Sequence, residues 1–298
     1  MFEAMAGTPG GIGAETVRTQ IRAWLAEDIG SGDITSWATI PAGSRSSAVI
    51  HVKESGILAG IPIARLVFEV VDASLAFRPL AADGDRVAKG DVIAEVEGST
   101  HSILTGERLA LNLMQRMSGI ATKTRAFVDA LEGLPTRLVD TRKTTPGHRQ
   151  LEKYAVRVGG GFNHRFGLYD AVMIKDNHIK GSGGIAGAVT AARHAIPHTM
   201  KIEVETESLE QVEEALACGA DIIMLDNMPH ERMREASSII KARSPHVIVE
   251  ASGNVRLDTV RAIAECGVDV ISVGGLTYSF QSLDISLDLH GKKGGAPA

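Results

Sequence analysis

Apolar side chains recur at helical spacing between Glu15 and Asp28. This pattern predicts an amphipathic helix at the start of the folded chain. Residues 1–14 precede that helix and are expected to form a loose tail. They lack the basic and then apolar order of a signal peptide, so we expect no targeting segment there.

Strand-like segments follow this first helix. Residues 47–53 and 75–80 are interpreted as strands, and residues 83–99 place glycine-marked turns around another strand. A helix is predicted over residues 61–71, between the first two strands. Together these elements predict a small α+β domain over residues 15–117.

Residues 106–131 form a long helical pattern that Ser118 and Gly119 interrupt. We expect the helix to break there and one domain to give way to the next. After Pro135, apolar strands alternate with helical segments of about 10–20 residues. This alternation predicts a parallel α/β architecture, with a barrel domain over residues 118–276.

A weak internal repeat supports the barrel. Residues 216–225 and 264–273 both place a Cys-Gly pair at a helix end just before a strand. Gly219 and Gly267 are therefore predicted to end helices in the left-handed conformation. The preceding cysteines are interpreted as small buried residues.

Charge and cysteine content exclude several functional classes. The 298 residues carry a formal net charge of −5, which argues against nucleic acid or an anionic membrane as the main partner. No apolar run approaches the roughly 18 residues of a membrane span. Cys218 and Cys266 are too few for a disulfide framework and lack the close spacing of a zinc site, which fits a reducing cytoplasm.

Polar residues or glycines follow the predicted barrel strands. In α/β barrels, active-site groups lie at the carboxyl ends of the strands, so these residues are the candidates for chemistry. They are, in chain order, Thr141, Arg142 and Lys143; Lys175, Asp176 and Asn177; Glu205; Asp226; Ser252 and Gly253; and Gly274 and Gly275.

Cationic residues are concentrated between Thr141 and Lys180. This segment has eight Lys or Arg residues and three Asp or Glu residues, a local excess of five positive charges in a chain with a net charge of −5. Arg142, Lys143 and Lys175 flank strand ends, and an Arg-Lys pair suits a ligand with several anionic groups. The remaining basic residues at near-helical spacing are interpreted as a solvated helix face in preference to ligands; they are Arg149, Lys153 and Arg157.

A glycine-rich run over residues 159–168 contains His164 and Arg165. Its three glycines permit unusual backbone angles, so the loop can present both side chains to a ligand. The run lacks the context of a phosphate-binding P-loop and of a dinucleotide fingerprint. A simple connecting loop remains the alternative.

Two carboxylates end neighbouring strands. Glu205 and Asp226 suit a hydrated Mg²⁺, which proteins usually hold through one or two carboxylates plus substrate phosphates. Alternatively, Lys201, Glu203 and Glu205 form a buried polar ladder, because strand alternation places them on one face. The glycine turns after the last two strands are either phosphate-binding backbone or simple tight turns.

Taken together, these motifs resemble those of the quinolinate phosphoribosyltransferase family, over nearly the whole of residues 24–289. Each motif is short, but their order and spacing are highly specific. They are EDIGSGDIT (27–35), TGERLALNLMQRMSGIAT (105–122), DTRKTTPG (140–147), GGGFNHRFGLYDAVMIKDNHI (159–179), EVE (203–205), DIIMLDN (221–227), EASG (250–253) and ISVGGLT (271–277).

The resemblance implies an α/β fold with an N-terminal α+β sandwich-like domain and an incomplete (β/α) barrel. It implies that residues 277–298 return toward the N-terminal domain. It also implies a homodimer, with higher assembly left open, in which Arg108 reaches the partner's active site. The residues expected to surround quinolinate are Arg108, Arg142, Lys143, His164, Arg165 and Lys175; those expected to hold ribose, phosphate and Mg²⁺ are Glu205, Asp226, Ser252, Gly253, Gly274 and Gly275.

The implied reaction transfers a phosphoribosyl group from phosphoribosyl pyrophosphate to quinolinate and releases CO₂, pyrophosphate and nicotinate mononucleotide for NAD biosynthesis. Lys143, Lys175, Glu205 and Asp226 are the expected catalytic residues. Alternatives are a related phosphoribosyltransferase, either a molybdenum-locus paralogue or a nicotinate-using enzyme; a sugar-phosphate aldolase or isomerase with a Schiff-base lysine; and a non-catalytic anion-binding barrel.

The chain departs from the family pattern at two positions. His148 follows TTPG where an apolar residue is common, and Asn254 stands where a second glycine is frequent after Ser252 and Gly253. Neither change removes a predicted contact. The second change leaves the geometry of the predicted phosphate loop open.

Overall fold

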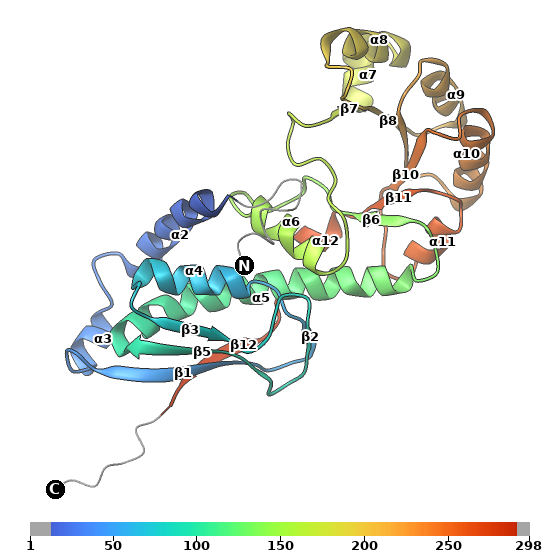
Figure 1. Cartoon of the computed structure of the whole chain (residues 1–298). Helices are drawn as coiled ribbons and strands as arrows, with labels where there is room; N and C mark the ends of the chain where they lie inside the picture. Colours follow the sequence, from blue (N-terminus) through green and yellow to red (C-terminus); the bar gives the residue numbers. More distant parts are fainter. Residues whose placement is uncertain (1–12, 291–298) are drawn as a thin grey trace, which may run out of the picture. The chain divides into compact units, whose positions relative to one another are not determined.

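The computed structural model describes residues 13–290 (Figure 1). The tail predicted over residues 1–14 lies outside this range except for its last two positions, and Ala14 already begins helix α2 (Ala14–Ile29). The chain forms two compact units. The first comprises the residues up to Lys123, Gln150–Gly159 and the residues from Phe280, and the second comprises Thr124–Arg149 and Gly160–Ser279.

An antiparallel sheet in the order β12-β1-β5-β3 forms the centre of the first unit. Alternate residues of β1, among them Ala48, Ile50 and Val52, are fully buried, and helices α4 and α5 cover one face of the sheet (Figure 1). The strands predicted around residues 47–53 and 75–80 and the helix predicted over 61–71 are confirmed. The elements are α3 (Ile34–Thr39), β1 (Arg45–Val52), β2 (Gly56–Ile57), α4 (Ile61–Val71), β3 (Ala76–Pro79), β4 (Arg86–Val87), β5 (Val92–Ser99), α5 (Thr100–Ala130) and β12 (Ile285–Leu289).

Helix α5 corrects the predicted break at Ser118 and Gly119, because it continues without interruption from Thr100 to Ala130. The hydroxyl of Ser118 instead bonds the backbone of Ala59, which donates to it at 2.9 Å and accepts from it at 3.1 Å. A Cβ at position 119 would lie 2.2 Å from the carbonyl oxygen of Gln281. The two small residues therefore permit close packing between segments that are distant in sequence.

We expect Gly119→Ala to lower the free energy of unfolding by about 2–3 kcal/mol, because the added methyl group meets rigid backbone. Urea unfolding followed by circular dichroism measures the effect. Gly181→Ala is the matched control, since nothing lies within 4 Å of a Cβ at that helical position. Equal stability of the two variants would contradict the packing role of Gly119.

Six parallel strands in the order β6-β11-β10-β9-β8-β7 form the second unit. The sheet has β6 and β7 at its edges, and helices α7 to α11 lie on its outer face (Figure 1). This arrangement is the predicted incomplete barrel. Its elements are β6 (Arg137–Val139), β7 (Val172–Ile174), α7 (Asp176–Ser182), α8 (Ile185–Ala195), β8 (Ile202–Thr206), α9 (Leu209–Ala217), β9 (Ile222–Asp226), α10 (His230–Arg243), β10 (Ile248–Ser252), α11 (Val260–Ala264), β11 (Val270–Ser272) and α12 (Gly275–Tyr278).

The predicted helix terminators are confirmed. Gly219 and Gly267 have φ angles of 74° and 87°, the left-handed conformation that glycine adopts most easily. Each is followed within a few residues by a barrel strand, so the repeat ends one helix and starts the next strand. Of the two cysteines before these glycines, Cys266 is buried as predicted, whereas Cys218 is half-buried.

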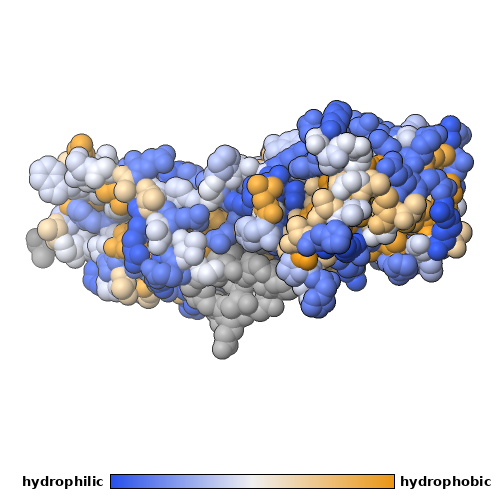
Figure 2. Space-filling view, turned by 90° about the horizontal axis from the view of Figure 1, so that it is seen from above, coloured by the Kyte–Doolittle hydropathy of each residue, from blue (hydrophilic) through white to orange (hydrophobic). Residues whose placement is uncertain are grey.

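The surface carries polar and apolar side chains interspersed (Figure 2). Among the described residues, the most exposed large apolar residue is Trp37 on α3, whose relative exposure is 80%. Within residues 13–290, no helix combines the length and the apolar character that a membrane span needs.

Candidate functional site

Asp140 fixes the glycine-rich loop beside strand β6. Its buried carboxylate accepts hydrogen bonds from the Asn163 side chain at 2.6 Å and from the backbone N–H of His164 at 2.9 Å. Phe162 forms a parallel bridge with Val139, the last residue of β6. These contacts hold the loop at the carboxyl edge of the sheet, where the chemistry was predicted.

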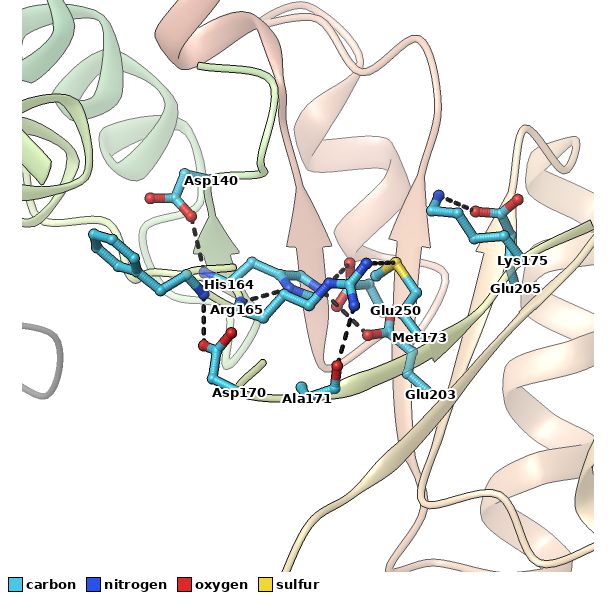
Figure 3. A network of polar contacts seen from close by, with 11 residues as sticks. Asp140, His164, Arg165, Asp170, Ala171, Met173, Lys175, Glu203, Glu205 and Glu250 are labelled. Atoms are coloured by element: carbon cyan, nitrogen blue, oxygen red, sulfur yellow. Dashed lines mark hydrogen bonds and ion pairs between the residues drawn. The ribbon is translucent and has the colours of Figure 1, made fainter. Parts of the chain in front are cut away.

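Arg142 and Arg165 form a cationic pair at this edge. Burial lowers the pKa of Arg165, and the neighbouring charge of Arg142 lowers it further. The Arg165 guanidinium donates to the carbonyl oxygen of Ala171 at 3.1 Å and contacts the sulfur of Met173 (Figure 3). Among the residues of the described chain, no carboxylate forms an ion pair with either guanidinium. The charges of Glu203 and Asp170 offset only part of this lowering of the Arg165 pKa, so the two neighbouring guanidiniums favour an anionic ligand.

Arg149 and Lys153 differ from the predicted solvated face. The Arg149 guanidinium donates to the Thr144 hydroxyl at 2.9 Å, to the Phe166 carbonyl at 3.1 Å and to the Arg142 carbonyl at 3.3 Å. It therefore joins the loop after β6 to the glycine-rich loop. Lys153, on helix α6 (Arg149–Val158), is 1% exposed. Helical spacing shows which residues share a face of the helix, but it does not show which faces other segments bury.

Lys143 lies across Gly274. A Cβ at Gly274 would be 2.9 Å from Cδ of Lys143, so the glycine leaves room for the observed position of this side chain. The carbonyl oxygen of Lys143 accepts a hydrogen bond from the Thr277 hydroxyl at 2.9 Å. A predicted quinolinate residue and a predicted phosphate glycine are thus neighbours, because β6 and β11 are adjacent strands.

Lys175 and Glu205 form an ion pair. The ammonium group of Lys175 lies 2.6 Å from Oε2 of Glu205, and this pair lies apart from His164 (Figure 3). Lys175 directly follows β7, and Glu205 is on β8. The interaction joins the residues predicted for the two substrates, so a substrate anion that binds Lys175 competes with Glu205 for the same cation.

His164 lies between two buried glutamates, Glu203 of β8 and Glu250 of β10. Its Nε2 is 3.2 Å from Oε2 of Glu203 and 3.5 Å from Oε1 of Glu250 (Figure 3). Burial alone lowers the pKa of His164, but the two glutamates outweigh it and raise that pKa to about 10. Burial also raises the pKa of Glu203.

The hydrogen bond at Nδ1 bears on where the protons of this cluster lie. Nδ1 of His164 accepts the backbone N–H of Arg165 at 2.7 Å, which favours an imidazole with its one proton on Nε2. In that case a second proton of the cluster lies on one of the two glutamates, in keeping with the raised pKa of Glu203. An imidazolium between two carboxylates holds the same number of protons. Either way, the cluster carries a net charge of −1 near neutral pH.

We expect the cluster to make stability depend on pH. Because the folded pKa of His164 is raised to about 10 from an unfolded value of about 6.5, its stabilisation is full below pH 6.5 and is lost as pH rises toward 10. The slope is at most about 1.4 kcal/mol per pH unit. Urea unfolding between pH 6.5 and 9 measures it.

Glu250→Gln removes one of the two carboxylates and should flatten this pH dependence. Exposed Glu231, replaced by glutamine, is the control and should leave the slope unchanged. An unchanged slope in the Glu250 variant would show that the proton is held elsewhere.

Candidate metal ligands occur in two places. His164, Glu203 and Glu250 are the one group of the described chain that brings three potential ligand atoms within 4.8 Å of one another. The predicted Mg²⁺ residues, Glu205 and Asp226, lie at the carboxyl ends of adjacent strands, where Thr206 pairs with Leu225. Two carboxylates of this kind fit an ion whose remaining ligands are water and substrate phosphate, so Mg²⁺ stays a prediction there.

The remaining predicted residues are distributed over both units. Ser252 ends β10 beside Asp226 of β9, and Gly253 follows it with a φ angle of 93°. Gly275 begins the short helix α12. Arg108 is on α5 in the first unit, and its side chain is 59% exposed. The structure therefore brings together the barrel residues of the prediction and leaves Arg108 outside that unit.

Two family models match the chain. The model described as quinolinate phosphoribosyl transferase, N-terminal domain, matches residues 33–118, and the corresponding C-terminal domain model matches residues 120–288. The chain belongs to the quinolinate phosphoribosyltransferase family. The family resemblance predicted from the sequence is confirmed.

Individual relatives agree with the family assignment. The chain is 49% identical to a probable nicotinate-nucleotide pyrophosphorylase [carboxylating] of Synechocystis, over 90% of this chain and 91% of the relative. It is 48% identical to the protein of the same name from Bacillus subtilis, over 88% and 90%. The crystal structure of NadC from Streptococcus pyogenes superposes with a TM-score of 0.89 at 43% identity and covers 94% of this chain and 98% of that one.

The sequence analysis did not predict the contacts of three acidic residues that hold the glycine-rich loop and His164. They are Asp140, Glu203 and Glu250. Glu203 entered only an alternative interpretation, a buried polar ladder with Lys201 and Glu205. The structure buries Glu203 and leaves Lys201 exposed before the strand begins. A signal existed, since a glutamate within an otherwise apolar barrel strand needs a buried partner.

Proposed function

We propose that the carboxyl edge of the six-stranded sheet performs the family's reaction, the decarboxylating transfer of a phosphoribosyl group to quinolinate. The observation that carries this proposal is the neighbouring Arg142 and Arg165 pair, whose guanidiniums form no direct ion pair with a carboxylate of the described chain. Quinolinate is a dicarboxylate, and arginine binds carboxylates through two parallel hydrogen bonds. Lys143 and Lys175 supply further positive charge beside the same strand ends.

In the proposed reaction, the pyridine nitrogen of quinolinate attacks the anomeric carbon of phosphoribosyl pyrophosphate. The bond from that carbon to the pyrophosphate oxygen breaks, and pyrophosphate leaves with the electron pair. Positive charge develops on the ribose, so carboxylates close to it stabilise the transition state. Glu205 and Asp226, at the ends of adjacent strands, would take that role.

A bound Mg²⁺ would neutralise the pyrophosphate that leaves. Glu205 and Asp226 would hold it, directly or through water. Ser252, Gly253, Gly274 and Gly275 would bind the ribose 5′-phosphate, since barrels commonly bind phosphate after their last two strands. Lys143, whose side chain passes Gly274, would supply a cation beside this phosphate.

Decarboxylation follows from the product of the first step. The pyridinium nitrogen withdraws electrons from the ring, so the carbon–carbon bond to the 2-carboxylate breaks and its electron pair remains on the ring carbon. A proton from solvent then completes nicotinate mononucleotide. The protein's residues are needed to hold the ring in place, and no general base takes part in this step.

We also propose that the active site is shared between two subunits. Arg108 is exposed, and the described ion pairs give it only a loose contact of 3.9 Å with the adjacent Glu107. In a homodimer, this guanidinium would supply another cation for the dicarboxylate of the partner's site.

The two unpaired cysteines fit a location in the reducing cytoplasm.

Substrate preference tests the proposed function. Purified protein with Mg²⁺ and phosphoribosyl pyrophosphate is expected to use quinolinate with a kcat/KM at least about a hundredfold above that for nicotinate, because nicotinate leaves half-buried cations without a partner. Chromatography of the nucleotide product gives both rates. A preference for nicotinate would overturn the assignment of the cationic pair to a dicarboxylate.

A further inference from the structure

Two asparagines at the carboxyl edge of the barrel have an unusual backbone. Asn227 follows β9 and has a φ angle of 52°, and Asn254 follows β10 by two residues and has a φ angle of 49°. They are the only non-glycine residues between positions 13 and 290 with a positive φ. Such conformations cost free energy and tend to occur where function requires them. Both side chains are exposed, so burial of an apolar core does not explain them.

The two side-chain amides form a directed chain of hydrogen bonds that ends on Asp226. Nδ2 of Asn254 donates to Oδ1 of Asn227 at 2.9 Å, and Nδ2 of Asn227 donates to Oδ2 of Asp226 at 2.9 Å. Because the first bond occupies the oxygen of the Asn227 amide, its NH₂ group faces the carboxylate. The Asn227 side chain therefore presents a hydrogen-bond donor, not an acceptor, to Asp226.

Backbone contacts fix the same amide. The N–H of Asn227 donates to the carbonyl oxygen of Ser252 at 2.9 Å, which extends the pairing of β9 with β10. A Cβ at Gly253 would lie 2.2 Å from Oδ1 of Asn227, so the amide lies against the bare Cα of that glycine. The predicted phosphate loop and the predicted Mg²⁺ carboxylate are thus connected through Asn227.

We propose that Asn227 and Asn254 are positioning residues that orient the Asp226 carboxylate toward Mg²⁺ and the ribose of phosphoribosyl pyrophosphate. The inference deepens the proposed function and rests on its assignment of Asp226. Asn254 adopts the left-handed backbone that glycine adopts most easily, and it adds a side-chain amide. These hydrogen bonds thereby couple binding of the 5′-phosphate to the orientation of the Asp226 carboxylate.

Three variants test this coupling. Asn227→Gly and Asn254→Gly remove an amide but tolerate the left-handed backbone. Asn254→Asp replaces the donor by an acceptor, which draws the NH₂ group of Asn227 away from Asp226. We expect the KM for phosphoribosyl pyrophosphate and the Mg²⁺ concentration for half-maximal rate to rise about tenfold in Asn227→Gly, with a larger rise in Asn254→Asp than in Asn254→Gly. The KM for quinolinate should change less than twofold.

Calorimetric titration of each variant with phosphoribosyl pyrophosphate and Mg²⁺ gives the same comparison without turnover. Weaker binding in Asn254→Asp than in Asn254→Gly supports the directed chain. Equal binding in all three variants and the wild type would overturn it. A wild-type protein that binds phosphoribosyl pyrophosphate but does not convert quinolinate would refute the proposed function alone, since the binding comparison still decides the role of the asparagines.

Discussion

Arg165→Ala is expected to lower kcat/KM for quinolinate by about a hundredfold to a thousandfold, because removing this half-buried guanidinium leaves a carboxylate of the bound substrate without its charged partner. Arg165 is suited to this role by its position. Its guanidinium bonds a carbonyl oxygen and contacts a thioether, and burial and Arg142 lower its pKa more than the charges of Glu203 and Asp170 raise it. Steady-state kinetics with quinolinate as the varied substrate measures the loss.

Two further variants show whether charge or shape matters at this position. Arg165→Lys keeps the charge but loses the two-pronged geometry, so its loss should fall between those of the wild type and Arg165→Ala. Arg193→Ala is the surface control, since Arg193 pairs with Asp221 before strand β9 begins. Its kcat/KM should stay within about twofold of the wild type. Equal losses in the Arg165 and Arg193 variants would contradict the assignment.

Mixing two inactive proteins should restore activity if subunits share their sites. Arg108→Ala removes the residue proposed to act in the partner's site, and Lys175→Ala removes a residue of the subunit's own barrel. Random exchange makes about half of the dimers mixed, and each mixed dimer has one intact site, so about a quarter of wild-type activity should return. The activity of the mixture is followed over the time course of exchange.

The control for this experiment pairs two changes in one barrel. Arg165→Ala mixed with Lys175→Ala leaves both sites of a mixed dimer defective and should restore nothing. Exchange is verified by mass spectrometry of differently tagged subunits. Mixed dimers of Arg108→Ala and Lys175→Ala that remain inactive would refute the shared site.

Local patterns predicted the elements and the edge of the site well. The helix predicted over Glu15 to Asp28 and the glycine terminators at Gly219 and Gly267 depend on periodicity and backbone freedom, which short segments specify. Carboxyl-end placement of Arg142 and Lys175 follows from the parallel order of the strands. The helix and its terminators are decided by neighbouring residues, and the strand ends follow from the regular alternation of strands and helices along the chain.

Contacts between distant segments account for what the sequence did not predict. Gly119 was expected to break α5, but the helix needs that glycine because the chain near Gln281 packs there. Lys153 was expected in solvent because helical spacing does not show that the helix is covered on several sides. The His164 cluster joins a loop to strands β8 and β10, so neither glutamate could be matched to its partner from spacing alone.

The measurement that tests the central claim most directly uses quinolinate labelled in the 2-carboxyl group. With phosphoribosyl pyrophosphate and Mg²⁺, the purified protein should release labelled CO₂ and form nicotinate mononucleotide in equal amounts, and omission of phosphoribosyl pyrophosphate should abolish both. Nucleotide that retains the label, or CO₂ release without phosphoribosyl pyrophosphate, would contradict decarboxylating phosphoribosyl transfer.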